Sequence, residues 1–490
     1  MKEEVQIGLR VMVESAQRDI NWDDRKAGKG LNFEAYDIVT RSAEQSGVTS
    51  FTARSASGTL SRSLNVHLRS IHKSNLVGRS LSLRPVIMPR PYAIIVLLVC
   101  SIFKTASAAR PSSYAVWAAD SAIARHQGNG LDTNGNAIVS YEHGEFQWGL
   151  RQLFEITGNV TYFNYIKQGI DNIVFDNGTV HGSYVVTDYV LDPLRTGPTM
   201  IYLHEETHNR TSKYKIGADT FRGQLNSHPR TTQGQFWHKL KYPNQGWLDG
   251  IYMGEIFYSD YTSTFEPQNT TAWNDITNQF VLMFQNTLQN ATAPNNTGLM
   301  YHGYDHSHVA SWASADRGHS PEVWDRALGW YSMALVDVLD IIPQSHPGHN
   351  SILSILQLLA PHIRNAADPT SGAWWLVITQ PGRAKNYFES SGTAMFVYAL
   401  LKAVRLGHVR DDDGSIVLSA RKAYEYMLDN WVIDNHDGTM NWLNTVVVGS
   451  LDTTGDFNYY VSQATDVNDL KGLAAFLLAS IEFEKLPHVG

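Results

Sequence analysis

Cysteine is almost absent from the chain: Cys100 is the only one among 490 residues. A single cysteine excludes a fold held together by disulfides and a zinc site built from thiolates. Basic residues are also scarce, with 39 Lys and Arg against 47 Asp and Glu. A nucleic-acid binder usually needs a basic face, so this balance argues against one. Hydrophobic residues make up 43% of the chain, which is typical of a globular protein.

The start of the chain differs from the rest. The segment 54–84 is rich in Ser and Arg and poor in acidic residues. Met88-Pro-Arg-Pro follows, then an apolar run over 92–103 and the small residues 106–108. The apolar run is too short to span a membrane, which takes about 20 residues. A basic start, a short apolar core and an A-x-A site are typical of a secretory signal peptide.

We therefore predict a signal peptide over 88–108 and a secreted, extracellular protein with no membrane anchor once the signal is removed. Residues 1–87 are then a non-native or disordered extension, and a genuine basic targeting arm is the alternative. Cys100 lies inside the signal, so the mature chain would contain no cysteine. Glycosylation sequons, which fit a secreted glycoprotein, stand at Asn159, Asn177, Asn209, Asn269, Asn290 and Asn295.

From residue 109 onward an apolar helix alternates six times with an amphipathic one. The apolar helices are expected at 146–157, 193–206, 248–261, 327–339, 392–404 and 469–481. The amphipathic helices are expected at 113–125, 162–174, 212–225, 272–288, 351–366 and 416–431. A recurring helix pair indicates a repeat architecture. We predict an all-α fold over 109–490, an (α/α)6 barrel of six helical hairpins. An open solenoid is the alternative, but it would need polar terminal caps.

In such a barrel the apolar inner helices run parallel, so their N-termini share one mouth. Polar residues stand at these helix starts: Asp192, Asp249, Trp324-Asp325-Arg326, Glu389, Asp466 and Asp469. An acid at such a position can simply be an N-cap, and for Asp466 and Asp469 that interpretation is favoured. Asp249 differs because it follows Trp247-Leu248 and precedes an apolar helix. We expect burial to raise its pKa, so that it holds a proton as a general acid must.

Two loops precede inner helices and carry further polar residues. The first, over 236–247, holds His238 and Lys239 among aromatic residues. The second, over 299–313, holds His302, His306 and His308. Histidines spaced H-x-x-x-H on a loop, with no acidic partner motif, are weak evidence for a metal. We predict no metal site and no cofactor.

Five long stretches carry a family resemblance: FWHKLKYPNQGWLDGIYMGEIFY, MYHGYDHS, PEVWDRALGWYSMALVDVLDIIP, ESSGTAMFVYALLKAVRLG and YYVSQATDVNDLKGLAAFLLAS. They resemble glycoside hydrolase family 105, the unsaturated rhamnogalacturonyl hydrolases, which is related to the unsaturated glucuronyl hydrolases of family 88. The matching region runs from about residue 145 to the C-terminus and includes no part of 1–87. The resemblance implies an (α/α)6 barrel, in agreement with the hairpin pattern.

The resemblance also implies roles for individual residues. Asp249 matches the catalytic acid/base, and Asp192 matches a second aspartate that positions substrate and water. The substrate-binding candidates are His238, Lys239, His302, Trp324, Arg326, Trp330 and Trp148. One departure concerns the stretch after Asp192, where family members often carry His-Ile-Asn and this chain carries Pro193-Leu194-Arg195.

The implied reaction removes a 4,5-unsaturated galacturonyl unit from the non-reducing end of a lyase-generated rhamnogalacturonan (pectin) oligosaccharide. Asp249 would protonate C4 of the C4=C5 bond, and water would then attack C5. Arg326 or Lys239 would pair with the uronate carboxylate, and Trp324 and Trp330 would stack on the sugar. For Arg326 a protein acid is the alternative partner, and for Trp330 core packing is the alternative.

Three other functions remain open at this point. One is an unsaturated glucuronyl hydrolase acting on other lyase products. Another is an ordinary glycosidase on saturated sugars that uses Asp192 and Asp249 as its two carboxylates. The third is a sugar-binding protein without catalysis, although the presence of Asp249 argues against it.

Overall fold

The structure is a computed structural model that describes residues 36–42, 48–55, 66–69, 111–207, 213–292 and 296–487. The chain divides into two compact units, Met1–Ser107 and Ala108–Gly490. In the first unit, strands β1 (Tyr36–Ser42), β2 (Val48–Ser55) and β3 (Val66–Arg69) pair antiparallel in that order. The predicted signal peptide over 88–108 lies outside the described residues, as do Asn209 and Asn295.

The second unit contains the twelve helical positions that the sequence predicts. The outer helices are α3 (Tyr114–Ala124), α5 (Val160–Asp171), α7 (Lys213–Ser227), α10 (Thr270–Thr287), α12 (Pro347–Asn365) and α14 (Ser415–Trp431). The inner positions are α4 (Tyr141–Thr157), η3 (Asp192–Thr196) with α6 (Gly197–Glu206), α8 (Leu248–Gly250) with η4 (Ile251–Glu255) and α9 (Ile256–Phe265), α11 (Asp325–Val338), α13 (Ser390–Arg405) and α16 (Leu470–Glu484). All fourteen residues of α11 are buried, as expected for a helix covered on every side.

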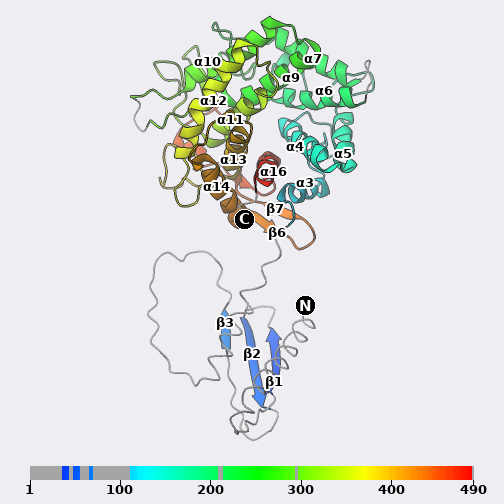
Figure 1. Ribbon diagram of the computed structural model, residues 1–490, viewed down its shortest axis with the longest axis vertical. Helices are drawn as coiled ribbons and strands as arrows, with labels where there is room; N and C mark the ends of the chain where they lie inside the picture. The colour runs from blue at the N-terminus through cyan, green and yellow to red at the C-terminus, as the bar shows by residue number, and fades with distance from the viewer. Residues whose placement is uncertain are drawn as a thin grey trace. The chain divides into compact units, whose positions relative to one another are not determined.

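The inner helices close into a ring (Figure 1). Neighbouring inner helices pack along the chain from α4 to α16, and α16 then packs against both α13 and α4. Contact between the first and last inner helices excludes the open solenoid. The predicted all-α (α/α)6 barrel is therefore confirmed.

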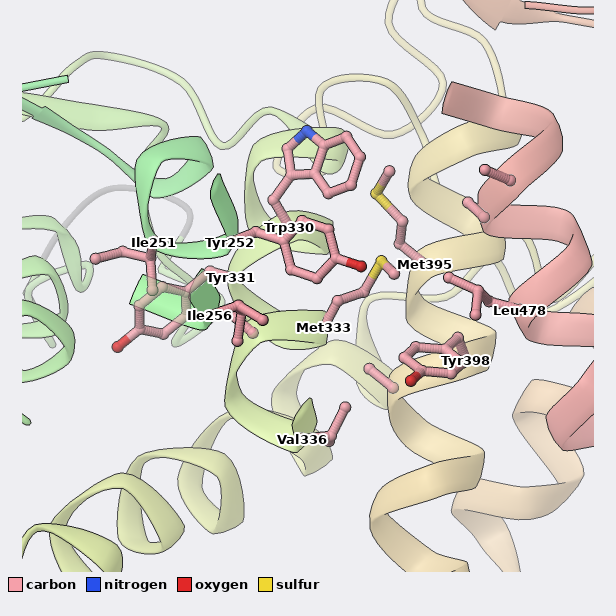
Figure 2. Packing of buried hydrophobic residues seen from close by; sticks show 14 of the residues in the cluster. Ile251, Tyr252, Ile256, Trp330, Tyr331, Met333, Val336, Met395, Tyr398 and Leu478 are labelled. Atoms are coloured by element: carbon pink, nitrogen blue, oxygen red, sulfur yellow. The ribbon is translucent and has the colours of Figure 1, made fainter. Parts of the chain in front are cut away.

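Side chains from several inner helices fill the barrel interior (Figure 2). The indole of Trp330 stacks on the ring of Tyr252, with centroids 4.9 Å apart and planes at 23°. Met333 of α11 and Met395 of α13 lie beside this pair. Aromatic pairs of this kind add about 0.5–1.5 kcal/mol beyond the burial of their area.

Polar side chains begin several of the helices. Asn159 caps α5 by accepting from Thr161 N, and Asn269 caps α10 by accepting from Ala272 N. Glu389 caps α13, and Asp469 caps α16, as the N-cap interpretation of Asp469 predicts. The same interpretation was wrong for Asp466, which lies in a short strand and accepts from Val467 N. Such caps satisfy backbone N–H groups that have no partner within the helix, and each contributes about 1 kcal/mol.

Short strands order the loops at the helix starts. Strand β4 (Gln245–Trp247) pairs antiparallel with β5 (Gly303–Asp305), and β8 (Thr445–Val446) pairs with β9 (Thr465–Asp466). A short loop joins β6 (Val432–Asp434) and β7 (Met440–Trp442), which pair as an antiparallel hairpin. A single helical turn, α15 (Phe457–Tyr460), precedes β9. Within the described ranges, no helix has the length and apolar character needed to cross a membrane.

Candidate active site

The β4–β5 pair brings Asp249 and His302 together. Trp247 pairs with Gly303, and Leu248 N donates to the carbonyl oxygen of His302 at 3.0 Å. This register places His302 Nε2 3.0 Å from Asp249 Oδ2. The imidazole is wholly buried, whereas the Asp249 side chain remains 15% exposed. Asp249 is thus the partly accessible end of a buried pair.

The backbone after Asp249 is unusual. Residues Ile251–Glu255 form a π-helical turn, η4, between the short helix α8 and helix α9. Turns of this kind are rare inside helices and occur often at functional sites. The turn places Tyr252 against Trp330 in the barrel interior, as Figure 2 shows.

The structure corrects the expected electrostatics of Asp249. Burial does raise the pKa of this carboxyl, but His302 and His238 outweigh burial and hold it below its ordinary value. The prediction of a raised pKa was therefore wrong, because the sequence does not show that histidines face this side chain. A neighbouring cation favours the charged form of a carboxyl.

Asp192 lies at the start of η3 and is held by the first loop. Lys239 Nζ donates to Asp192 Oδ2 at 2.5 Å, and His238 Nε2 lies 3.6 Å from Oδ1. An isolated antiparallel β-bridge between Val190 and Lys239 holds the two backbone segments together. Burial lowers the pKa of His238 to about 4, so the ring is neutral at neutral pH. We call Asp192, His238, Lys239, Asp249 and His302 the Asp249 cluster.

A cavity of about 230 Å³ opens beside Asp192. Its wall is mainly apolar, with a few polar groups. The lining residues are Ile138, Val139, Ser140, Tyr141, Ser183, Tyr184, Val185, Asp188, Val190, Asp192 and Pro193. An apolar pocket with a few convergent polar groups is typical of a small-ligand site.

Aromatic rings surround the Asp249 cluster. His238 stacks on Trp247 with ring centroids 4.5 Å apart. Trp324 stacks on Tyr460 at 5.6 Å and lies 4.8 Å from the His302 ring. Trp324 is only 2% exposed, so in this arrangement it contributes a buried wall behind His302.

Arg326 lies at the second residue of α11 and is 1% exposed. One of its nitrogens donates to the carbonyl oxygen of Val446, while Nε and Nη1 have no hydrogen-bond partner. Among the acids, Glu389 interacts with the guanidinium most strongly, followed by Asp469. The sequence leaves two partners open for Arg326, a substrate carboxylate or a protein acid. The structure shows a buried guanidinium among protein acids.

Those acids are engaged at their own helix starts. Glu389 Oε2 accepts from Gly392 N, and its Oε1 accepts from Val446 N. Burial, together with the nearby Glu389, raises the pKa of Asp325 well above its ordinary value. Lys471 Nζ forms an ion pair with Asp469 Oδ2. We call Asp325, Arg326, Glu389, Asp469 and Lys471 the Arg326 cluster.

Two predicted substrate-binding residues make their contacts outside the Asp249 cluster. Trp330 is 2% exposed and packs on Tyr252 and Tyr141, which agrees with the core-packing alternative. Trp148 lies seven residues beyond Tyr141 along α4, about 10 Å further down the helix. It lines a separate small cavity that also contains Arg195. The structure therefore does not bring Trp148 to the Asp249 cluster.

The remaining loop histidines do not join His302. His306 Nε2 contacts Thr232 Oγ1 at 2.6 Å, and His308 Nδ1 contacts the Ser314 carbonyl oxygen at 2.9 Å. Among the residues that the structure describes, no group of three or more His, Cys, Asp or Glu side chains could hold a metal ion.

One residue of the site, Tyr460, was not predicted. Its hydroxyl lies 2.7 Å from His302 Nδ1, on the side of the ring away from Asp249. The two residues are separated by 158 positions, so no local spacing links them. The only signal was that Tyr460 falls within YYVSQATDVNDLKGLAAFLLAS, a stretch with the family resemblance.

A comparison with known families decides which family the chain belongs to. Residues 114–487 match Glycosyl Hydrolase Family 88 along almost the whole second unit. The chain belongs to this family. Membership makes the protein a glycoside hydrolase and confirms the predicted relationship with families 105 and 88.

Individual relatives agree with the family 88 assignment. A family 105 glycoside hydrolase from C. acetobutylicum is 36% identical, with a TM-score of 0.70, and the alignment covers 76% of this chain and 100% of that one. Protein Atu3128 of Agrobacterium fabrum is 36% identical over 192 residues, 38% of this chain and 82% of its own length. The unsaturated rhamnogalacturonyl hydrolase YesR of Bacillus subtilis is 24% identical over 264 residues, 53% of this chain and 69% of its own length.

Proposed function

We propose that this family 88 hydrolase removes a 4,5-unsaturated galacturonyl unit from the non-reducing end of rhamnogalacturonan oligosaccharides made by a lyase. The observation that carries the proposal is the pairing of Asp249 with His302 next to an independently held Asp192. Asp249 can then exchange a proton beside His302, while Lys239 holds the Asp192 carboxyl group in place. The relationship to YesR supports the choice of substrate.

The reaction follows from the chemistry of an enol ether. Asp249, in its protonated form, delivers a proton to C4 of the substrate, and positive charge develops at C5 and the ring oxygen. Water adds at C5 and loses a proton to the Asp249 carboxylate, with Asp192 orienting the water. The hemiketal that results opens and releases the aglycone sugar. Because the bond attacked is C4=C5, two carboxylates flanking the anomeric carbon are not required.

The uronate carboxylate needs a cation, and of the two candidates, Lys239 and Arg326, Lys239 is the accessible one. Its side chain is 23% exposed, and one of its three N–H groups is used by Asp192. Arg326 is 1% exposed and lies among the acids of its own cluster. We therefore assign the carboxylate contact to Lys239 and place Arg326 second.

The test is an absorbance assay on matched oligosaccharides. Hydration removes the ultraviolet absorbance of the conjugated alkene, so a lyase-made rhamnogalacturonan disaccharide should lose it. The saturated disaccharide should stay intact. Cleavage of the saturated sugar would instead support an ordinary glycosidase, and turnover only of unsaturated glucuronyl substrates would support the other specificity.

Secretion is part of the proposal. N-terminal sequencing of protein collected from the medium should give a start just after residue 108. Recovery of peptides from 1–87 in the secreted protein would contradict both the signal peptide and the start at Met88.

A further inference from the structure

The ring of His302 has a different partner on each nitrogen. Nδ1 lies 2.7 Å from the hydroxyl oxygen of Tyr460, and Nε2 lies 3.0 Å from Asp249 Oδ2. His302 is wholly buried and Tyr460 is 1% exposed, so solvent does not compete for either contact. The three side chains form a single line from a tyrosine hydroxyl to the partly exposed carboxyl.

A tyrosine hydroxyl can donate or accept, and this determines the state at the other end of the line. When the hydroxyl donates to Nδ1, the ring proton is on Nε2, which lies 3.0 Å from the ionised Asp249 carboxylate. When the hydroxyl accepts from an N–H at Nδ1, the three side chains can take up one more proton from solvent through the partly exposed carboxyl. Nε2 then presents its lone pair, and Asp249 holds that proton. The second arrangement contains the acid that the hydration step needs.

We propose that Tyr460 is a positioning residue that sets the proton position on His302 and thereby lets Asp249 hold the proton that it takes up from solvent. This inference rests on the proposed function, because it assigns Asp249 the role of acid. Burial, with Asp249 nearby, raises the pKa of Tyr460 well above its ordinary value, so the hydroxyl keeps its own proton. Tyr460 therefore acts by rotating a hydrogen bond and does not ionise.

The surroundings hold Tyr460 and His302 in place. The Tyr460 ring stacks on Trp324, and α15 begins with an Asp456 cap that accepts from Tyr459 N. His238 is the titratable group that faces Asp249 and His302, and it is in turn faced by Asp192 and Lys239. The groups that face Tyr460 are Tyr459, Glu322 and Asp456.

The test is the pH profile of kcat/KM for Tyr460→Phe on the unsaturated substrate. An imidazolium loses a charge-assisted hydrogen bond in this variant, whereas the neutral ring loses an ordinary one. The pair then binds its last proton less tightly, so the alkaline limb should move to lower pH, by about half to one unit. In a His302→Gln background, Tyr460→Phe should cause no further shift.

Tyr459→Phe is the matched control. It removes a hydroxyl from the same helical turn, one that accepts from Ser450 N at 2.9 Å, and it leaves His302 untouched. Its alkaline limb should coincide with that of the wild type. An active wild type whose limb is unchanged in Tyr460→Phe overturns this inference alone, as does a Tyr460→Phe protein that fails to fold while Tyr459→Phe folds. A wild type that leaves the alkene absorbance intact overturns the proposed function instead.

Discussion

Two arcs of the barrel mouth carry acidic residues at helix starts, but the acids make different contacts. In the Arg326 cluster, Glu389 and Asp469 accept hydrogen bonds from backbone N–H groups of the helices that they begin. In the Asp249 cluster, the starts of η3 and α8 have no side-chain cap, and the carboxylates face a lysine and two histidines.

This difference indicates that the acids of the Arg326 cluster stabilise helices, whereas those of the Asp249 cluster are available for catalysis. A carboxylate that accepts a hydrogen bond from the backbone of its own helix stabilises that helix. Protonation of such a carboxylate would weaken the N-cap hydrogen bond. A carboxylate that faces a histidine can gain or lose a proton without loss of secondary structure. Asp249 and Asp192 also keep 15% and 19% of their side-chain surface exposed, whereas Asp325 and Glu389 keep none of theirs. A ligand can therefore reach Asp249 and Asp192 directly, but not Asp325 or Glu389.

The largest effect is expected for a substitution in the Asp249 cluster. Asp249→Asn should fold normally yet lose about 10²–10⁴-fold in kcat, because an amide cannot deliver a proton. The measurement is the loss of alkene absorbance, with a melting curve on the same sample.

Asp466→Asn is the control for Asp249→Asn. Asp466 is an exposed acid that accepts from Val467 N, so its variant should keep wild-type turnover. Equal turnover in the wild type and in Asp249→Asn would remove Asp249 from the catalytic role.

The next prediction compares one cation from each arc. Lys239→Met should raise KM about 10- to 150-fold with an unchanged melting temperature, because it removes a charge-assisted contact with the uronate. Arg326→Met should cost about 3–5 kcal/mol of unfolding free energy, because it leaves buried acids without their cation. Kinetics and urea unfolding on both variants decide between them. A raised KM with normal stability in Arg326→Met would transfer the carboxylate contact to Arg326.

The positions of the helices could be predicted from the sequence more fully than the contacts of the acidic residues. The twelve helices follow from apolar periodicity, which depends on local sequence alone. Helix α4 was expected from residue 146 but begins at Tyr141, because its first turns bury polar residues such as His143 and Glu145. A hydrophobicity pattern misses polar groups that line a barrel interior.

The site was predictable only in part, for a similar reason. Residue types and the family resemblance pointed to Asp249, Asp192 and His302, which the structure brings close together. The lowered pKa of Asp249 and the contact of Tyr460 depend on pairs distant in sequence, 53 and 158 positions apart. Only the closed fold defines such pairs.

A smaller effect concerns acid stability and compares a histidine in the site with one outside it. Burial lowers the pKa values of both His238 and His228 to about 4. An unfolded chain takes up a proton on each near pH 6.5, so stability is full above that pH and falls as the pH drops towards 4. Replacing either with Gln should reduce this loss and shift the acid-unfolding midpoint to lower pH. Only His238→Gln should also reduce activity. An unchanged midpoint in both variants would contradict the buried neutral state.

The smallest expected effect is that of metal removal. The ring nitrogens of His302 face Tyr460 and Asp249, and His306 and His308 are hydrogen-bonded to Thr232 and to the Ser314 carbonyl oxygen. A metal would have to replace these contacts, and neither hydration of the alkene nor proton transfer from Asp249 calls for a Lewis acid. Prolonged dialysis against a chelator should therefore leave kcat/KM within experimental error of the untreated enzyme. Activity that collapses on dialysis and returns with one added divalent ion would mean that a metal takes part in the Asp249 cluster. The difference between the two clusters would then depend on the charge of a bound metal ion as well as on the protein's own residues.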